Sequence, residues 1–235
     1  MTPLEYLKKY GNPTKENIER LNNGEPVQYI VGNVSFYGNI IDVDKRVLIP
    51  RFETEELVEN TIKYIKKYNY KSIVDLGCGS GCIAITLKKF FPNIIVDAVD
   101  ISLDALEVSK KNALKNNVSI NFYNGNLLDP LSSKYDIIIS NPPYIAYDEE
   151  IMDIVKNNEP HIALYADNNG LYYYEEIIKK CHNYLNDNGL IAFEIGYNQA
   201  NDIKKIASKH LKNYSIEIKK DMTGKDRMVF IKFND

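Results

Sequence analysis

Residues 140–144 read Ser-Asn-Pro-Pro-Tyr and carry acceptors suited to holding a planar NH2 group. They follow the apolar run 135–139, which places Asn141 and Pro142 at the carboxyl end of a predicted strand. Asn141 offers a side-chain oxygen and Pro142 a carbonyl, and the prolines at 142 and 143 fix the backbone before a substrate arrives. Tyr144 offers a flat face for stacking. An amide or aniline-type nitrogen is a weak nucleophile, so this loop is expected to act by orienting it.

A glycine-rich stretch, residues 74–83, reads as the end of a buried strand, a tight turn and the start of a helix. Gly77, Gly79 and Gly81 allow the backbone to turn sharply and to approach a ligand closely. Cys82 stands where a dinucleotide fingerprint needs its third glycine, and no Gly-Lys-Ser/Thr follows, so neither that fingerprint nor a P-loop is present. The alternatives for this corner are a turn with no ligand and a site for a different nucleotide.

Two acidic residues indicate which ligand the corner would take. Asp75 precedes the first glycine and would favour a cationic cofactor that carries an ammonium group. Asp100 ends the next apolar run and is placed to accept both ribose hydroxyls. The combination resembles the S-adenosylmethionine (SAM) site of class I methyltransferases, in which Asn126 would bond the adenine amine and Leu127 would cover the ring. The expected cofactor-binding residues are Asp75, Gly77, Cys78, Gly79, Ser80, Gly81, Asp100, Ile101, Asn126, Leu127 and Asn141.

The elements that must position these residues alternate between strand and helix from residue 71 onward. Strands are predicted at 72–76, 94–99, 118–123, 135–140, 189–195, 213–219 and 227–233, and helices at 80–90, 102–116, 168–186 and 197–211. Such alternation predicts an α/β fold whose mainly parallel sheet binds ligands at its carboxyl edge. The turn at 221–226 makes the last strand antiparallel.

The chain before the sheet divides into short segments. Residues 1–31 form a helical arm, 32–50 a β-hairpin linker, and 51–235 the predicted SAM-dependent domain. Pro3 and Gly11 bracket a first helix, Thr14 can cap a second, and Pro26 can open a third. Thr54, Ser102 and Asn198 are candidate caps of later helices.

Composition limits the functional classes. The 235 residues carry a net charge of −3, so no overall basic field attracts nucleic acid. No apolar run is long enough to span a bilayer. Three cysteines without a pairing pattern suggest reduced thiols, and we expect a cytoplasmic protein with no metal site. His161 is the obvious candidate base, but the chemistry needs no strong base, and an exposed loop histidine is the preferred interpretation.

From Gln28 onward the chain resembles the HemK/PrmC family of protein-glutamine N5-methyltransferases. The matching stretches beyond the glycine corner and N-P-P-Y are 28–32, 36–38, 48–55, 159–160, 194–197 and 224–227. The resemblance implies a seven-stranded Rossmann-like sheet with an antiparallel last strand. It implies methyl transfer from SAM to the glutamine amide nitrogen (N5) in the Gly-Gly-Gln motif of class I peptide-chain release factors, which supports translation termination. Asn141, Pro142 and Tyr144 would be catalytic, and Pro143 would join them in binding substrate.

The resemblance also implies that the release factor is the protein substrate. We expect a monomer with no stable nucleic-acid partner and no membrane association. Two departures stand out. Phe52 occupies the place of a second proline. The amino-terminal helical region, which in the family helps to engage the release factor, is much shorter here. Two other functions are open: an adenine-N6 methyltransferase on DNA or RNA, after base flipping, and a non-catalytic SAM-binding scaffold.

Overall fold

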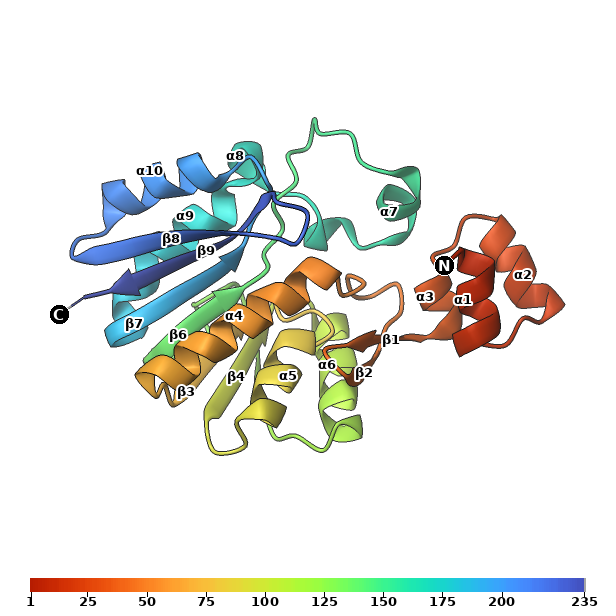
Figure 1. The fold of residues 1–235 in the computed structure, drawn as a ribbon, viewed down its shortest axis with the longest axis horizontal. Coiled ribbons are helices and arrows are strands. Elements are labelled where there is room, and N and C mark those ends of the chain that lie inside the picture. Colours follow the sequence, from red (N-terminus) through yellow and green to blue (C-terminus); the bar gives the residue numbers. More distant parts are fainter. Residues whose placement is uncertain (235) are drawn as a thin grey trace.

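A seven-stranded sheet forms the centre of the computed structural model, which describes residues 1–234 (Figure 1). Its strands are β3 (Ser72–Leu76), β4 (Ile95–Asp100), β5 (Asn121–Asn124), β6 (Tyr135–Ser140), β7 (Leu185–Glu194), β8 (Tyr214–Lys220) and β9 (Asp226–Phe233). The spatial order is β5-β4-β3-β6-β7-β9-β8. The pairs from β5 to β7 are parallel, whereas β9 is antiparallel to both β7 and β8. The predicted α/β fold with an antiparallel last strand is confirmed.

Helices cover both faces of the sheet because its central strands are apolar on both sides. One face packs against α4 (Phe52–Tyr68), α5 (Cys82–Phe90) and α6 (Leu103–Lys115), and the other against α9 (Tyr172–Lys180) and α10 (Ala200–His210) (Figure 1). Neighbouring residues of one strand therefore enter different cores: Ile73 joins the core under α4 and α5, while Val74 joins the core under α9 and α10.

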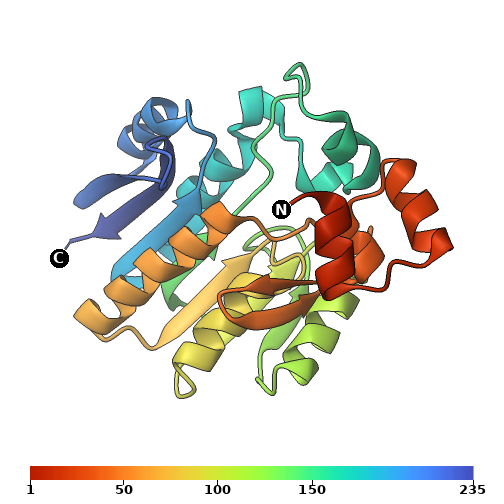
Figure 2. The same ribbon diagram turned by 45° about the vertical axis from the view of Figure 1, so that its right-hand side comes forward.

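The amino-terminal arm is a small group of helices beside the sheet (Figure 2). It comprises α1 (Pro3–Tyr10), α2 (Lys15–Asn22) and α3 (Val27–Val31), and the hairpin strands β1 (Asn33–Phe36) and β2 (Asn39–Asp42) follow. The Thr14 hydroxyl caps α2, as expected from the sequence, and the Thr2 hydroxyl caps α1, for which the sequence predicts only the bracketing Pro3 and Gly11. Leu7, Val27 and Ile30 form a separate small core.

Two predicted helix caps are wrong. Helix α4 begins at Phe52, so Thr54 lies inside the helix, where its hydroxyl donates to Glu194 instead of capping. Asn198 does not cap α10, which begins at Ala200 rather than 197. Residues 196–199 instead form a turn closed by the Gln199 N–H on the Gly196 carbonyl. Ser102 does cap α6 by accepting from the Ala105 N–H.

The helix predicted at 168–186 is broken. Asn168 and Asn169 adopt left-handed conformations within α8 (Asp167–Gly170), α9 then covers 172–180, a 3₁₀ turn covers 181–183, and β7 already begins at residue 185. Asparagine and glycine tolerate positive φ angles, which explains where the break falls. The strand predicted from 118 starts only at 121, because the Val118 N–H bonds the Ala113 carbonyl and closes α6.

No helix within residues 1–234 has the length and apolar character needed to cross a bilayer. The three cysteines are free and buried, as expected for packing residues.

Candidate active site

A cavity of about 770 Å³, counted with its open mouth, lies at the carboxyl edge of the parallel strands. Such an edge is where α/β sheets bind ligands. The cavity brings together both predicted motifs and the loop after β5. Of the predicted site residues, those that line it are Gly77, Gly79, Asp100, Ile101, Asn126, Leu127, Asn141, Pro142 and Pro143.

The glycine corner leaves space where a ligand can approach the backbone. Gly77 and Gly79 have φ angles of 69° and 53°, and a Cβ added to either would meet no atom within 4 Å. Asp100 holds this corner: its Oδ2 accepts from the Gly79 N–H at 2.8 Å and its Oδ1 from the Ser102 N–H at 2.9 Å. Each oxygen keeps a further lone pair for a hydroxyl in the cavity. Burial raises the pKa of Asp100, although these backbone N–H groups oppose the shift.

Asp75 lies behind the corner and does not line the cavity. It is fully buried, its Oδ2 accepts from the Ala84 N–H at 3.2 Å, and its Oδ1 has no hydrogen-bond partner. Burial raises its pKa to about 7. Cys78, Ser80 and Gly81 also lie outside the lining, so their contact with a cofactor, like that of Asp75, stays a prediction.

The N-P-P-Y loop is held from behind by neighbouring backbone and side chains. The Ser140 hydroxyl donates to the Leu76 carbonyl at 2.7 Å, and Gln199 Nε2 donates to the Tyr144 carbonyl at 2.9 Å. Within residues 1–234, neither Asn141 Oδ1 nor the Pro142 carbonyl accepts a hydrogen bond. Both acceptors are therefore unoccupied in the described chain, and their use by a substrate stays a prediction.

Tyr144 differs from the other loop residues. It does not line the cavity, and its hydroxyl lies 3.5 Å from Glu194 Oε1. The predicted stacking of a planar group on its ring is not tested by this geometry.

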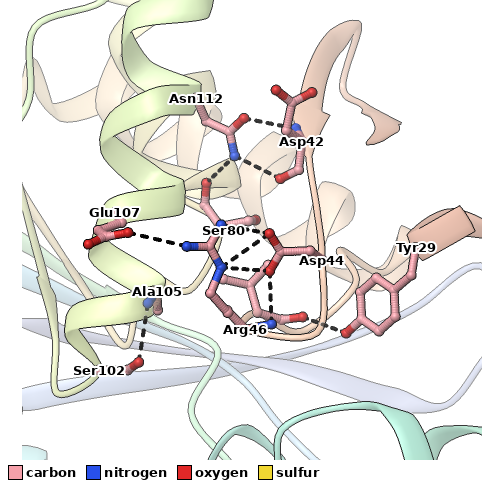
Figure 3. A network of polar contacts seen from close by, with 10 residues as sticks. Tyr29, Asp42, Asp44, Arg46, Ser80, Ser102, Ala105, Glu107 and Asn112 are labelled. Carbon is pink, nitrogen blue, oxygen red and sulfur yellow. Dashed lines mark hydrogen bonds and ion pairs between the residues drawn. The ribbon is translucent and has the colours of Figure 1, made fainter. Parts of the chain in front are cut away.

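One wall of the cavity follows the hairpin and was not predicted from the sequence. Arg46, Val47 and Leu48 line it, and a polar network holds their segment (Figure 3). Asn112 on α6 donates to the carbonyls of both Asp42 and Ser80, and so ties the hairpin to the glycine corner. The sequence predicts only a hairpin for residues 32–50, because the partners of this segment come from distant parts of the chain.

Another wall comes from the long connection after β6, where Pro160, Ile162 and Ala163 line the cavity. Glu159 anchors this connection: it is 4% exposed and accepts from the Ile49 N–H at 3.1 Å and from Arg51 Nη2 at 2.5 Å. His161 is exposed and lies outside the lining, as expected of a loop histidine.

The cavity suits a ligand with a ribose and an apolar ring, such as SAM. The Asp100 oxygens can accept hydroxyls, the open faces of Gly77 and Gly79 allow close approach, and Ile101, 54% exposed, offers an apolar surface. In the described part of the chain, no group of three or more His, Cys, Asp or Glu side chains could hold a metal ion.

Comparison with known proteins gives concordant matches. The family described as "Methyltransferase small domain" matches residues 36–158. The release factor glutamine methyltransferase of Lactococcus lactis subsp. lactis is 44% identical over 216 residues, covering 91% of this chain and 80% of the relative. That of Streptococcus pneumoniae is 43% identical, covering 88% and 75%. The crystal structure of the release factor-specific protein-(glutamine-N5) methyltransferase of Alicyclobacillus acidocaldarius has a TM-score of 0.50 at 25% identity, covering 80% and 95%.

Proposed function

Since this chain belongs to the family of release factor glutamine methyltransferases, we propose that it transfers a methyl group from SAM to the Gly-Gly-Gln glutamine of class I peptide-chain release factors. The acceptor is the side-chain amide nitrogen, N5. The observation that carries the proposal is the pair of unoccupied acceptors, Asn141 Oδ1 and the Pro142 carbonyl, at the edge of a cavity suited to SAM.

SAM, when bound, supplies a methyl group on a positively charged sulfonium. On the protein side, Asp100 would accept the ribose hydroxyls and the negative charge of Asp75 would favour the ammonium end. Asn126 and Leu127 would contact the adenine, with Ile101 beside them. Gly77 and Gly79 would allow the cofactor close to the backbone, and Cys78, Ser80 and Gly81 shape the turn that carries them.

The acceptor amide would be held by its two N–H bonds, one to Asn141 Oδ1 and one to the Pro142 carbonyl. This arrangement directs the nitrogen lone pair, which lies perpendicular to the amide plane, toward the methyl group. Pro143 restricts the backbone of Pro142, so its carbonyl is oriented before substrate binds. Tyr144 would flank the amide. The nitrogen loses its proton readily once methylated, so the residues here need only to orient it and exclude water.

The direct test is methyl transfer from labelled SAM to a purified class I release factor. The matched control is the same factor with its Gly-Gly-Gln glutamine changed to alanine, with DNA and RNA as further acceptors. Label on the unaltered factor alone is expected. Label on nucleic acid alone would replace the substrate, and binding of SAM without transfer to any acceptor would favour the scaffold function. Light scattering of the purified protein would test the expected monomer.

A further inference from the structure

A chain of hydrogen bonds behind the N-P-P-Y loop joins Asn141 to a buried carboxylate. Asn141 Nδ2 lies 3.1 Å from Thr54 Oγ1, which lies 2.6 Å from Glu194 Oε2. Thr54, on α4, is 2% exposed, and Glu194, at the end of β7, is 1% exposed. Neither lines the cavity. They can therefore influence a reaction there through Asn141, which does line it.

The direction of these hydrogen bonds follows from the chemistry of the three groups. An ionised carboxylate only accepts, so the Thr54 hydroxyl must donate its single proton to Glu194. The Thr54 oxygen can then only accept, and the group of Asn141 that donates to it is the NH2. The side-chain amide of Asn141 is thereby fixed with its oxygen directed away from Thr54.

Building on the proposed function, we propose that Thr54 and Glu194 are positioning residues that make Asn141 present its oxygen, and not its NH2, to the nitrogen that is methylated. If the Asn141 side-chain amide were turned by 180°, its NH2 would face the NH2 of the substrate. Both groups are donors, so no hydrogen bond would form between them. The location of Thr54 inside α4, where it caps nothing, is explained by this role.

The surroundings of Glu194 control its charge. Burial raises its pKa to about 7, while the Thr54 hydroxyl and Arg227 on β9 lower it and Glu53 on α4 raises it. Tyr144 lies 3.5 Å from Oε1, and the Tyr174 hydroxyl on α9 donates to the Glu194 backbone carbonyl. When Glu194 is protonated it can donate to Thr54, and the chain can reverse. The value of kcat is therefore expected to rise with pH through about 7.

The first test compares T54V, which keeps the shape and loses the hydroxyl, with T54S, which keeps the hydroxyl. T54V is expected to lower kcat by about 10- to 100-fold, with the KM for SAM changed less than about threefold, and to lose the rise of kcat near pH 7. T54S should keep both kcat and the pH profile. E194Q, whose Oε1 can still accept from Thr54 but whose side chain does not titrate, should lose the rise of kcat near pH 7. A T54V protein with unchanged kcat, or an E194Q protein that keeps the rise of kcat near pH 7, would overturn the proposal.

A second measurement is independent of any substrate. The ¹⁵N side-chain amide resonance of Asn141, assigned by its disappearance in N141A, is expected to shift in T54V and E194Q and to stay in place in T54S. Absence of a shift would refute the positioning role. If wild-type protein does not methylate a release factor but the resonance shifts as expected, the proposed function fails while the positioning of Asn141 stands. If T54V does not fold, the isosteric E194Q provides the same readout.

Discussion

Asn141 is one of the three residues of the N-P-P-Y loop that line the cavity. Its NH2 group is bonded to Thr54, and its oxygen accepts no hydrogen bond within residues 1–234. The Asn141 side chain is therefore oriented before substrate binds, because its NH2 is already hydrogen-bonded and its oxygen is not. Orientation is the main contribution that a weak amide nucleophile requires.

Replacing Asn141 by alanine is expected to lower kcat at least about 100-fold, because one of the two acceptors for the substrate amide is lost. The Kd for SAM, measured by calorimetry, should change less than about threefold, since Asp100 and the glycine corner are untouched. Equal losses of turnover and of SAM affinity would show that Asn141 serves the cofactor instead.

At the scale of elements, the position of the N-P-P-Y loop depends on the broken helix that packs against it. Gly170 has a φ angle of 79°, and an added Cβ would lie 2.1 Å from the Tyr144 carbonyl oxygen. Gln199, just before α10, donates to that same carbonyl. The break that interrupts the predicted helix at 168–186 therefore allows α8 to pack directly on the N-P-P-Y loop.

Gly170→Ala is expected to destabilise the protein by at least about 2 kcal/mol, from left-handed strain together with the clash, and to lower kcat by displacing Tyr144. Gly38→Ala is the matched control, since Gly38 has a φ angle of 78° but nothing within 4 Å of an added Cβ. It should lose only about 1 kcal/mol, the cost of the strain, and keep its activity. Urea unfolding and methyl transfer measure both effects, and equal losses in the two variants would rule out the clash.

At the scale of the molecule, the helices of the amino-terminal arm share a small apolar core apart from the cores of the sheet. Helices α1 and α2 contact α3 and have a small core of their own, while Tyr29 on α3 donates to the Val47 carbonyl and joins the main core. Of the arm, α3 is thus the part that supports the cavity wall.

Removal of residues 1–25 is expected to leave the Kd for SAM within about threefold of wild type and to raise the KM for the release factor, because the arm is expected to help engage that partner. Calorimetry and steady-state kinetics check the two effects. An unchanged KM would show that the release factor binds to residues 26–235 alone.

Stability is expected to fall as pH rises toward 7. Burial raises the pKa of both Asp75 and Glu194 to about 7, above their unfolded values, so the folded state binds more protons between about pH 4 and 7. The free energy of unfolding should therefore decrease by about 2 kcal/mol per carboxyl between pH 5.5 and 8. Urea titrations of wild type and E194Q test this: the variant should lose about half of the decrease. Stability that increases with pH over this range would contradict the prediction.

Local sequence determined the order of the helices and strands and the two motifs of the site. The apolar runs, the glycine corner and the N-P-P-Y loop each depend on neighbours within about ten residues, and the order of strands and helices follows from their period. Ser102 and Thr14 cap helices as their local patterns predict. The positions of Asp100 and Asn141 at one edge follow from parallel strands, whose carboxyl ends must meet.

The tertiary structure alone decided which residues surround that edge. Val47 and Pro160 reach the cavity through contacts between segments that are far apart in the chain. Thr54 does not cap a helix because its hydroxyl donates a hydrogen bond to Glu194, 140 residues away. The break before α9 arises in the same way, where Gly170 packs against Tyr144. Local propensity specifies a helix or a strand. The hydrogen-bond partner of a buried polar side chain is set only when distant segments pack together. The same packing produces the burial that raises the pKa of Asp75 and Glu194.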